Sequence, residues 1–345
     1  VVGLERLLPA YAHRYGEYPY PGLTVVIPPR GAEGAGGMEY PTLITSESFW
    51  WMNEPALPAT LRFVDYVTFH EFGHQYFYGL VASSEWSHPM LDEGFTEYAT
   101  CAGLEDLYGN GGPFFEAPSL GVRLESFAFE AANSAEIKHV YAVARGASEF
   151  PSFGSYAGHV YPRTATVLRT AEFMCGRERF RQAMRAYAER WRFRHPTPED
   201  FFTVMRENLG DEPVERLLRP ALTRPMRLDY SVQLVEDRTV GSTHFGRAVI
   251  HREGTLELPV HVVLERADGV RQTVTWDGRG EMFEVPYEGS VALRAARVDP
   301  EGRVPLDANR INNARVVAGE SVASSAGLLS RTAYWVGLLL QAVGP

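Results

Sequence analysis

Two histidines and two glutamates in this chain have the spacing of a metal site that carries its own base. His70 and His74 flank Glu71 in the segment His-Glu-Phe-Gly-His, and Glu93 follows after eighteen intervening residues. Positions i and i+4 of a helix lie about 40° apart around the axis, so both imidazoles can reach one ion. Glu93 can supply a third, carboxylate ligand, which leaves one position for water, as in catalytic zinc sites. The spacing therefore predicts one Zn2+ per chain, with Glu71 as the general base.

The chemistry that follows is metal-assisted hydrolysis of an amide. Zinc lowers the pKa of a bound water, and Glu71 can take a proton from it and pass that proton to the leaving amine. Glu97, one turn after Glu93, and Asp92 are candidate outer partners of the ligating histidines. Alternatively, these two carboxylates lie on the solvated surface of a helix. The alternative for the whole motif is an amphipathic helix with two exposed histidines.

Two helices must hold these residues. The apolar pattern predicts a long helix over Leu61–Leu80 and a second helix that starts near Leu91 and folds back on the first. Upstream of them, the sequence predicts a helix around Leu4–Tyr11, a short strand at Leu23–Ile27, and an extended segment at Met38–Ser46.

Between Gly109 and Gly158 the apolar spacing is weak and predicts no clear element. Further helices follow this stretch. Thr164–Cys175 is helical by its spacing. Apolar residues at steps of four, three and four predict one helix face made of Phe180, Met184, Tyr187 and Trp191. Thr197 is a predicted N-cap for a helix that runs to Leu209, with Gly210 as its C-cap.

The composition changes near Arg227, where short runs rich in valine and threonine begin. Turn residues such as Ala267-Asp268-Gly269 and Asp277-Gly278 separate several of them. Regular short strands with this punctuation predict an antiparallel β-sandwich of about a hundred residues. The predicted strands are Ser231–Val235, Ala248–His251, Leu256–Leu264, Val270–Trp276 and Val291–Val298.

The composition limits the number of domains and the kinds of partner to expect. A chain of 345 residues with 45% hydrophobic residues predicts two globular domains, and a net charge of −10 argues against a nucleic-acid partner. Two cysteines, Cys101 and Cys175, make no disulfide framework, and burial as small apolar residues is expected for both. An apolar stretch at Gly327–Val343 favours a packed or interfacial helix, which leaves membrane association, compartment and oligomeric state open.

Two more segments agree with a known family. Gly36-Gly37-Met38-Glu39-Tyr40 ends thirty-one positions before Glu71, and residues 91–98 read LDEGFTEY. Together with H-E-x-x-H, these segments resemble the motifs G-[AG]-M-E-N and W-L-N-E-G-F-A-E-Y of the gluzincin zinc aminopeptidases, the family of alanyl aminopeptidase and leukotriene-A hydrolase. The resemblance covers about Tyr11–Leu209 well. Departures at Tyr40, Met90 and Asp92 concern the first side-chain pocket and remove neither a ligand nor the base.

The resemblance assigns further residues. Glu39 matches the carboxylate that holds the substrate's free α-amino group, beside Gly36, Gly37 and Met38, which border the bound peptide. Tyr161 matches the donor that stabilises the oxyanion, although Pro162-Arg163-Thr164 replaces the family's Glu-Lys-Gly. Two neighbours, Tyr156 and His159, are its rivals for that role.

The resemblance also implies the fold and the activity. We expect an α+β multidomain chain: a thermolysin-like, mainly helical catalytic domain over 1–222, an antiparallel β-sandwich over 223–318 and a helical tail over 319–345. Family members carry a β-rich domain ahead of this point, so the chain is expected to start internally. The expected activity is removal of the N-terminal residue from peptides. The alternatives are a thermolysin-type endopeptidase and an inactive binding module of the same fold.

Overall fold

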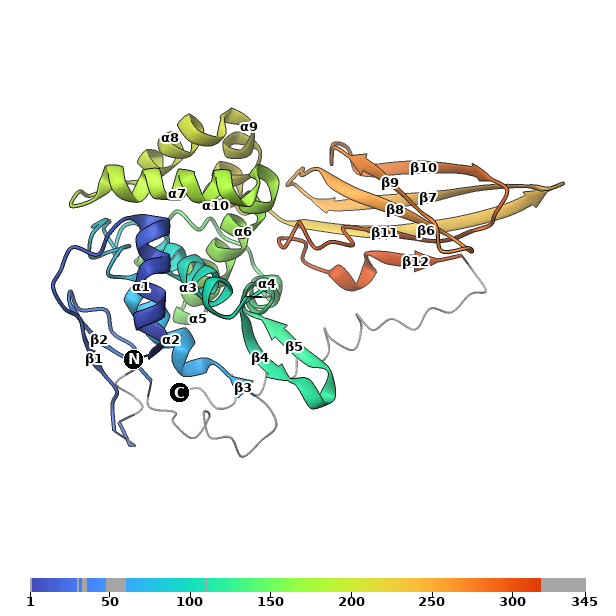
Figure 1. Ribbon diagram of the computed structural model, residues 1–345. Helices are drawn as coiled ribbons and strands as arrows, with labels where there is room; N and C mark the ends of the chain where they lie inside the picture. The colour runs from blue at the N-terminus through green and yellow to red at the C-terminus, as the bar shows by residue number, and fades with distance from the viewer. Residues whose placement is uncertain (1, 30, 33–35, 48–59, 110, 318–345) are drawn as a thin grey trace. The chain divides into compact units, whose positions relative to one another are not determined.

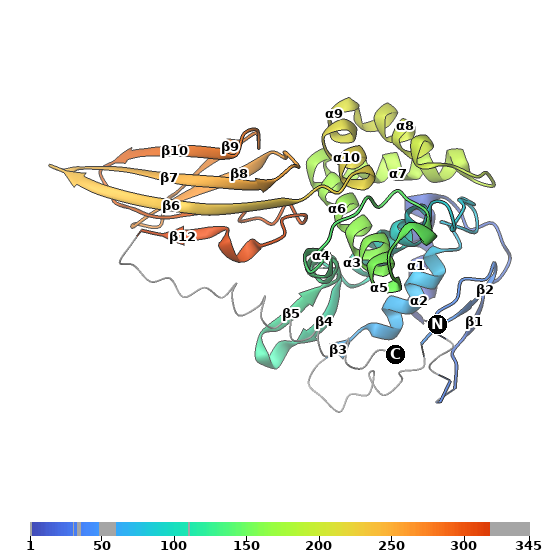
Figure 2. The same ribbon diagram turned by 180° about the vertical axis from the view of Figure 1, so that it is seen from behind.

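The chain divides into two compact units, with the boundary between Pro225 and Met226 (Figures 1 and 2). The computed structural model describes residues 2–29, 31–32, 36–47, 60–109 and 111–317. The expected tail over 319–345, with its apolar stretch, lies outside the described residues. Within those described ranges, no helix has the length and apolar character to cross a membrane.

The first unit is mainly helical and carries two small sheets. In one sheet β1 and β2 pair in parallel, and in the other β3, β4 and β5 pair antiparallel in that order. The helices are α1 (Val2–Tyr15), α2 (Phe63–Gly73), α3 (Glu93–Tyr108), α4 (Ser126–Ala135), α5 (Phe153–Gly158), α6 (Thr164–Cys175), α7 (Arg177–Trp191), α8 (Pro198–Leu209), α9 (Asp211–Pro213) and α10 (Arg219–Thr223). The strands are β1 (Thr24–Val26), β2 (Leu43–Thr45), β3 (Thr60–Leu61), β4 (Pro113–Ala117) and β5 (Val122–Glu125).

Several helices match their predicted bounds. α6 has the predicted ends, and α8 has Thr197 as N-cap and Gly210 as C-cap. The backbone N–H of Thr197 donates to Asp200 at 2.8 Å, which completes a capping box. Gly210 adopts a φ of +87°, a conformation that favours glycine. Local sequence signals therefore determine this helix.

The predicted helix over Leu61–Leu80 is wrong in its extent, because α2 ends at Gly73. His74 is the C-cap, and its carbonyl accepts a hydrogen bond from the Gly79 N–H at 2.8 Å. Tyr78, with a φ of +103°, turns the chain back. The apolar residues that suggested more helix are buried in this turn, and periodicity does not distinguish a buried turn from a buried helix.

α2 and α3 pack closely and form the centre of the first unit. From Gly94 to Glu105 every residue of α3 is buried, so the helix is enclosed by protein. At the crossing, a Cβ added to Gly73 would lie 2.8 Å from Cγ2 of Thr96, so only glycine permits this approach. Cys101 in α3 is buried as expected, while Cys175 is half-buried, and both are free thiols.

The second unit consists of two antiparallel sheets. One has the order β10-β7-β6 and the other β12-β11-β8-β9, with β6 packed against β11 and β12. The predicted turn at Ala267–Gly269 is confirmed, since Arg266 N–H donates to Val270 across it. β8 begins later than predicted, and β10 and β12 were missed. The strands are β6 (Leu228–Val240), β7 (Thr243–Gly254), β8 (Val260–Arg266), β9 (Arg271–Trp276), β10 (Met282–Gly289), β11 (Leu293–Val298) and β12 (Ala314–Val316).

Candidate active site

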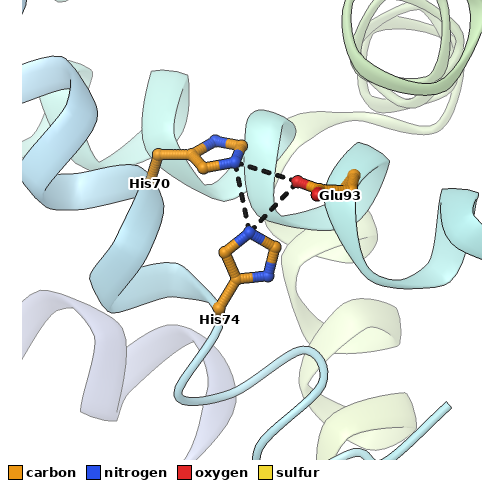
Figure 3. A group of neighbouring side chains, drawn as sticks. All are labelled: His70, His74 and Glu93. Carbon is orange, nitrogen blue, oxygen red and sulfur yellow. Dashed lines mark hydrogen bonds and ion pairs between the residues drawn. The ribbon is translucent and has the colours of Figure 1, made fainter. Parts of the chain in front are cut away.

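The three predicted metal ligands converge at the contact between α2 and α3. Figure 3 shows His70 and His74 reaching from one segment towards Glu93 on the facing helix. The Nε2 atoms of the two histidines lie 3.2 Å apart, and each lies 3.1 Å from Oε2 of Glu93. All three side chains are largely buried. Helix geometry accounts for the histidine pair, whereas the carboxylate arrives from a separate helix.

This donor set fits a zinc ion. Bonds of 2.0–2.1 Å in a tetrahedron place neighbouring ligand atoms about 3.3 Å apart, close to the separations of His70, His74 and Glu93. Two imidazole nitrogens and one carboxylate oxygen are ligands that zinc accepts in catalytic sites. The carboxyl groups of Asp92, Glu93 and Glu97 surround the two histidines. Their negative charge favours a bound cation at this place. The residues present therefore suit the predicted cofactor.

Each histidine has a carboxylate behind its other ring nitrogen. Nδ1 of His74 lies 2.6 Å from Asp92, and Nδ1 of His70 lies 2.8 Å from Glu97. Burial alone would lower the pKa of His70, but hydrogen bonds with Glu93 and Glu97 raise that pKa to about 10. Burial acts against protonation of His74 too, and Asp92 raises its pKa well above the usual value. Such partners orient the rings, so that both Nε2 atoms would face a bound ion.

Glu71 lies in a space that exists because residue 37 is glycine. A Cβ built on Gly37 would lie 2.0 Å from Oε1 of Glu71 and 2.6 Å from its Cδ. Burial raises the pKa of Glu71 to about 7, the two neighbouring histidines oppose the shift, and Glu39 adds to it. A buried carboxylate beside a metal site, with a pKa near neutrality, has the properties of a general base.

The GGMEY segment is tied to the turn after α2 by Gln75, the residue after His74. Its side-chain amide donates to the carbonyl of Tyr40 at 3.1 Å and to that of Glu39 at 3.4 Å. On the other side of the segment, Met38 accepts from the Thr45 N–H at 2.9 Å. Thr45 also donates its hydroxyl to the Gly36 carbonyl at 2.8 Å. The segment is thereby held beside Glu71, with the Met38 side chain exposed.

Tyr161 adjoins the metal ligands from a π-helix over His159–Arg163. Its ring stacks on His70 with centroids 5.7 Å apart, so the side chain lies against one of the predicted ligands. Burial, followed by the charge of Glu93, raises the pKa of Tyr161, so its hydroxyl keeps its proton. Gly94 allows this approach, because an added Cβ would lie 2.6 Å from the Val160 carbonyl oxygen.

The two rivals of Tyr161 are placed differently. His159 uses both ring nitrogens on the backbone: Nδ1 lies 2.7 Å from the Ser155 carbonyl, and Nε2 accepts from the Tyr141 N–H at 2.9 Å. This arrangement suits a structural role. Tyr156 packs edge-on against Tyr161, with ring centroids 6.2 Å apart, and so stands one side chain further from His70.

A cavity of about 780 Å3 opens beside the site. Tyr161, Glu97 and Tyr66 form its wall on the metal side, and Phe153 and Lys138 belong to its outer lining. Neither Glu39 nor Glu71 lines it.

Sequence reasoning missed several residues of the site. Gln75 could have been found from the sequence, because it follows His74 directly and therefore lies in the same turn. Glu130 in α4 and its partner Tyr66 had none, because their contact with Glu97 joins three helices that are distant in sequence. Thr96, whose hydroxyl lies 3.3 Å from Nδ1 of His74, was also missed.

Comparisons with known proteins agree with these motifs. The model of the peptidase family M1 domain matches residues 3–220. Aminopeptidase M1-B of rice (Oryza sativa subsp. japonica) is 30% identical over 207 residues, which is 58% of this chain and 22% of the rice protein. Probable aminopeptidase 1 of Sulfurisphaera tokodaii is 23% identical over 219 residues, or 62% of this chain and 27% of that protein. The chain thus spans about a quarter of the length of these relatives.

A solved structure extends the comparison to the fold. The crystal structure of Legionella pneumophila aminopeptidase A in complex with aspartic acid aligns with a TM-score of 0.58 and 16% identity, over 88% of this chain and 34% of that one. The helices and antiparallel sheets of this chain are consistent with an M1 aminopeptidase-like multidomain fold. The family match covers well over half of the chain, and the resemblance drawn from the motifs is confirmed. This chain belongs to peptidase family M1.

Proposed function

We propose that this chain is a zinc-dependent aminopeptidase that removes the N-terminal residue from peptides. The observation that supports the proposal is the placement of the Glu39 segment beside Glu71 and the predicted metal ligands. Gln75 ties the segment of Glu39 to the turn that bears His74, and Gly37 of the same segment lies against Glu71. A metal site alone would suit any peptide bond, whereas an anion at a set place beside it selects a chain terminus.

The proposed metal ligands are His70, His74 and Glu93. A zinc ion held there supplies Lewis-acid chemistry, acidifying a water molecule and polarising the scissile carbonyl. Glu71 is the proposed base, taking a proton from the attacking water and delivering it to the leaving amine. Its burial supports this role, since a raised pKa lets a carboxylate accept a proton and then release it.

Tyr161 is the proposed oxyanion donor. Its hydroxyl keeps its proton, and its ring is held against His70, so the donor is positioned before substrate arrives. A preorganised donor stabilises developing charge without reorganising during the reaction. Glu39 then pairs with the α-ammonium group of the substrate, and Gly36, Gly37 and Met38 border the peptide backbone. The substrates are accordingly peptides with a free N-terminus.

The two units also support a proposal for the domains and their folds. We propose a thermolysin-like catalytic domain over 1–222 and a β-sandwich over 223–318, in which the two sheets of the second unit face each other through β6 and β11. No motif in the second unit suggests chemistry, so its proposed role is structural.

A panel of aminoacyl fluorogenic amides, offered to the zinc-restored protein with free or acetylated α-amino groups, tests the function. An aminopeptidase hydrolyses the free forms and leaves the acetylated forms intact. Equal cleavage of both would instead indicate an endopeptidase. Protein that binds zinc but hydrolyses neither form would indicate a binding module.

A further inference from the structure

A row of three polar side chains leads from His70 into the interior of the first unit. Tyr66 lies one turn before His70 on α2, Glu97 lies on α3 and Glu130 lies on α4. The Tyr66 hydroxyl is within hydrogen-bond distance of Oε1 of Glu97 and lies 2.7 Å from Oε1 of Glu130. Oε2 of Glu97 lies 2.8 Å from Nδ1 of His70. Glu130 is 2% exposed and is not among the predicted site residues.

The position of the Tyr66 hydroxyl is set by packing. Its ring meets Phe114 edge-on at 5.3 Å and Phe129 edge-on at 6.5 Å, measured between centroids. The hydroxyl is therefore held between the two carboxyl groups by the core.

The hydrogen count decides how these groups share protons. A tyrosine hydroxyl has one proton and can donate to only one of two carboxyl oxygens. The other oxygen must then donate to the tyrosine, so one of the two acids is protonated. Glu97 faces His70, whose Nδ1 must donate to it if Nε2 is to hold a metal. Glu130 has no such neighbour, and its burial, followed by the charge of Glu97, raises its pKa well above the usual range.

We propose that Glu130 and Tyr66 are positioning residues that hold the Glu97 carboxylate behind His70. The Tyr66 hydroxyl joins Glu130 to Glu97, and the other oxygen of Glu97 lies 2.8 Å from Nδ1 of His70. The Glu97 carboxylate is thereby held against Nδ1 of His70, which leaves Nε2 for an ion. Glu130 and Tyr66 are therefore positioning residues for the metal, and this inference rests on the proposed zinc site.

Two matched substitutions test which of the two acids acts directly on His70. Glu130→Gln keeps a donor towards Tyr66, so the zinc dissociation constant should stay within about threefold of wild type. Glu97→Gln replaces the carboxyl group beside Nδ1 of His70 with an amide, and zinc binding should weaken by about 10-fold or more. The reverse ranking, with Glu97→Gln silent and Glu130→Gln harmful, would overturn the assignment. Competition with a chromogenic chelator measures the constants without any use of activity.

Two further variants test whether the row matters for the metal. Tyr66→Phe removes one oxygen and keeps the ring, and Glu130→Leu removes the donor. Both should weaken zinc binding by about 10-fold, and wild-type affinity in both would refute the proposal. Glu136→Gln, at an exposed acid that lines the same cavity, is the matched control and should bind zinc normally. If Glu130→Leu fails to fold, Tyr66→Phe still decides, and wild-type protein that binds no zinc would refute the proposed function itself.

Discussion

Replacing Gly37 with alanine tests whether Glu71 acts from the position seen here. The added Cβ would lie 2.0 Å from Oε1 of Glu71, and real Cβ contacts essentially never fall below 3.0 Å. The carboxylate must therefore move by about 1 Å. Because a displacement of about 1 Å can cost about 100-fold in rate, we expect kcat to fall about 100-fold, which is about 2.7 kcal/mol in the barrier.

The rest of the site should tolerate this change. The three atoms nearest the added Cβ all belong to the flexible end of Glu71, and the φ of Gly37 is outside the left-handed region. Zinc per chain and Tm should therefore stay at wild-type values. Hydrolysis of an aminoacyl amide gives kcat, atomic absorption gives zinc, and calorimetry gives Tm. Gly22→Ala is the control, because within the described residues its Cβ would meet no heavy atom within 4 Å.

A double variant separates this mechanism from a general disturbance of the peptide path. If Gly37→Ala acts through Glu71, adding it to Glu71→Gln should lower kcat little further, since residues acting as a unit are not additive. Independent, multiplying losses would show that Gly37 acts on substrate binding instead. Wild-type kcat in Gly37→Ala would refute the argument, because the base would then work from some other position.

Other substitutions test the remaining roles. Glu71→Gln should keep zinc and lower kcat by about 1,000-fold or more, and substantial residual turnover would show that another group is the base. Glu39→Ala should raise KM for free-amine substrates by about 10- to 100-fold, because a charged hydrogen bond is lost, and unchanged kinetics would remove Glu39 from the site. Asp92→Ala should weaken zinc binding by about 10- to 100-fold, measured by chelator competition, because Nδ1 of His74 loses its partner at 2.6 Å; retained affinity would contradict the orienting role.

Some features of this protein are local and were readable from the sequence. The spacing of His70 and His74 on one face follows from helix geometry, and it holds although α2 ends at Gly73, since the His74 N–H still donates to the His70 carbonyl at 3.2 Å. The caps of α8 were predicted because capping depends on neighbouring residues. The turn at Ala267–Gly269 was readable for the same reason.

Other features depend on which segments meet, and periodicity carries no information about that. The sequence did not indicate that Gly37 makes room for Glu71, that Gln75 holds the GGMEY segment, or that Glu130 reaches Glu97 through Tyr66. Apolar spacing shows which face of a helix is buried, but the partner of that face is chosen by packing over the whole unit. The sequence alone predicted the ligand types and their chemistry. Tertiary packing decided their distances, their outer partners and their protonation, because burial and neighbouring charges arise only when distant helices are brought together.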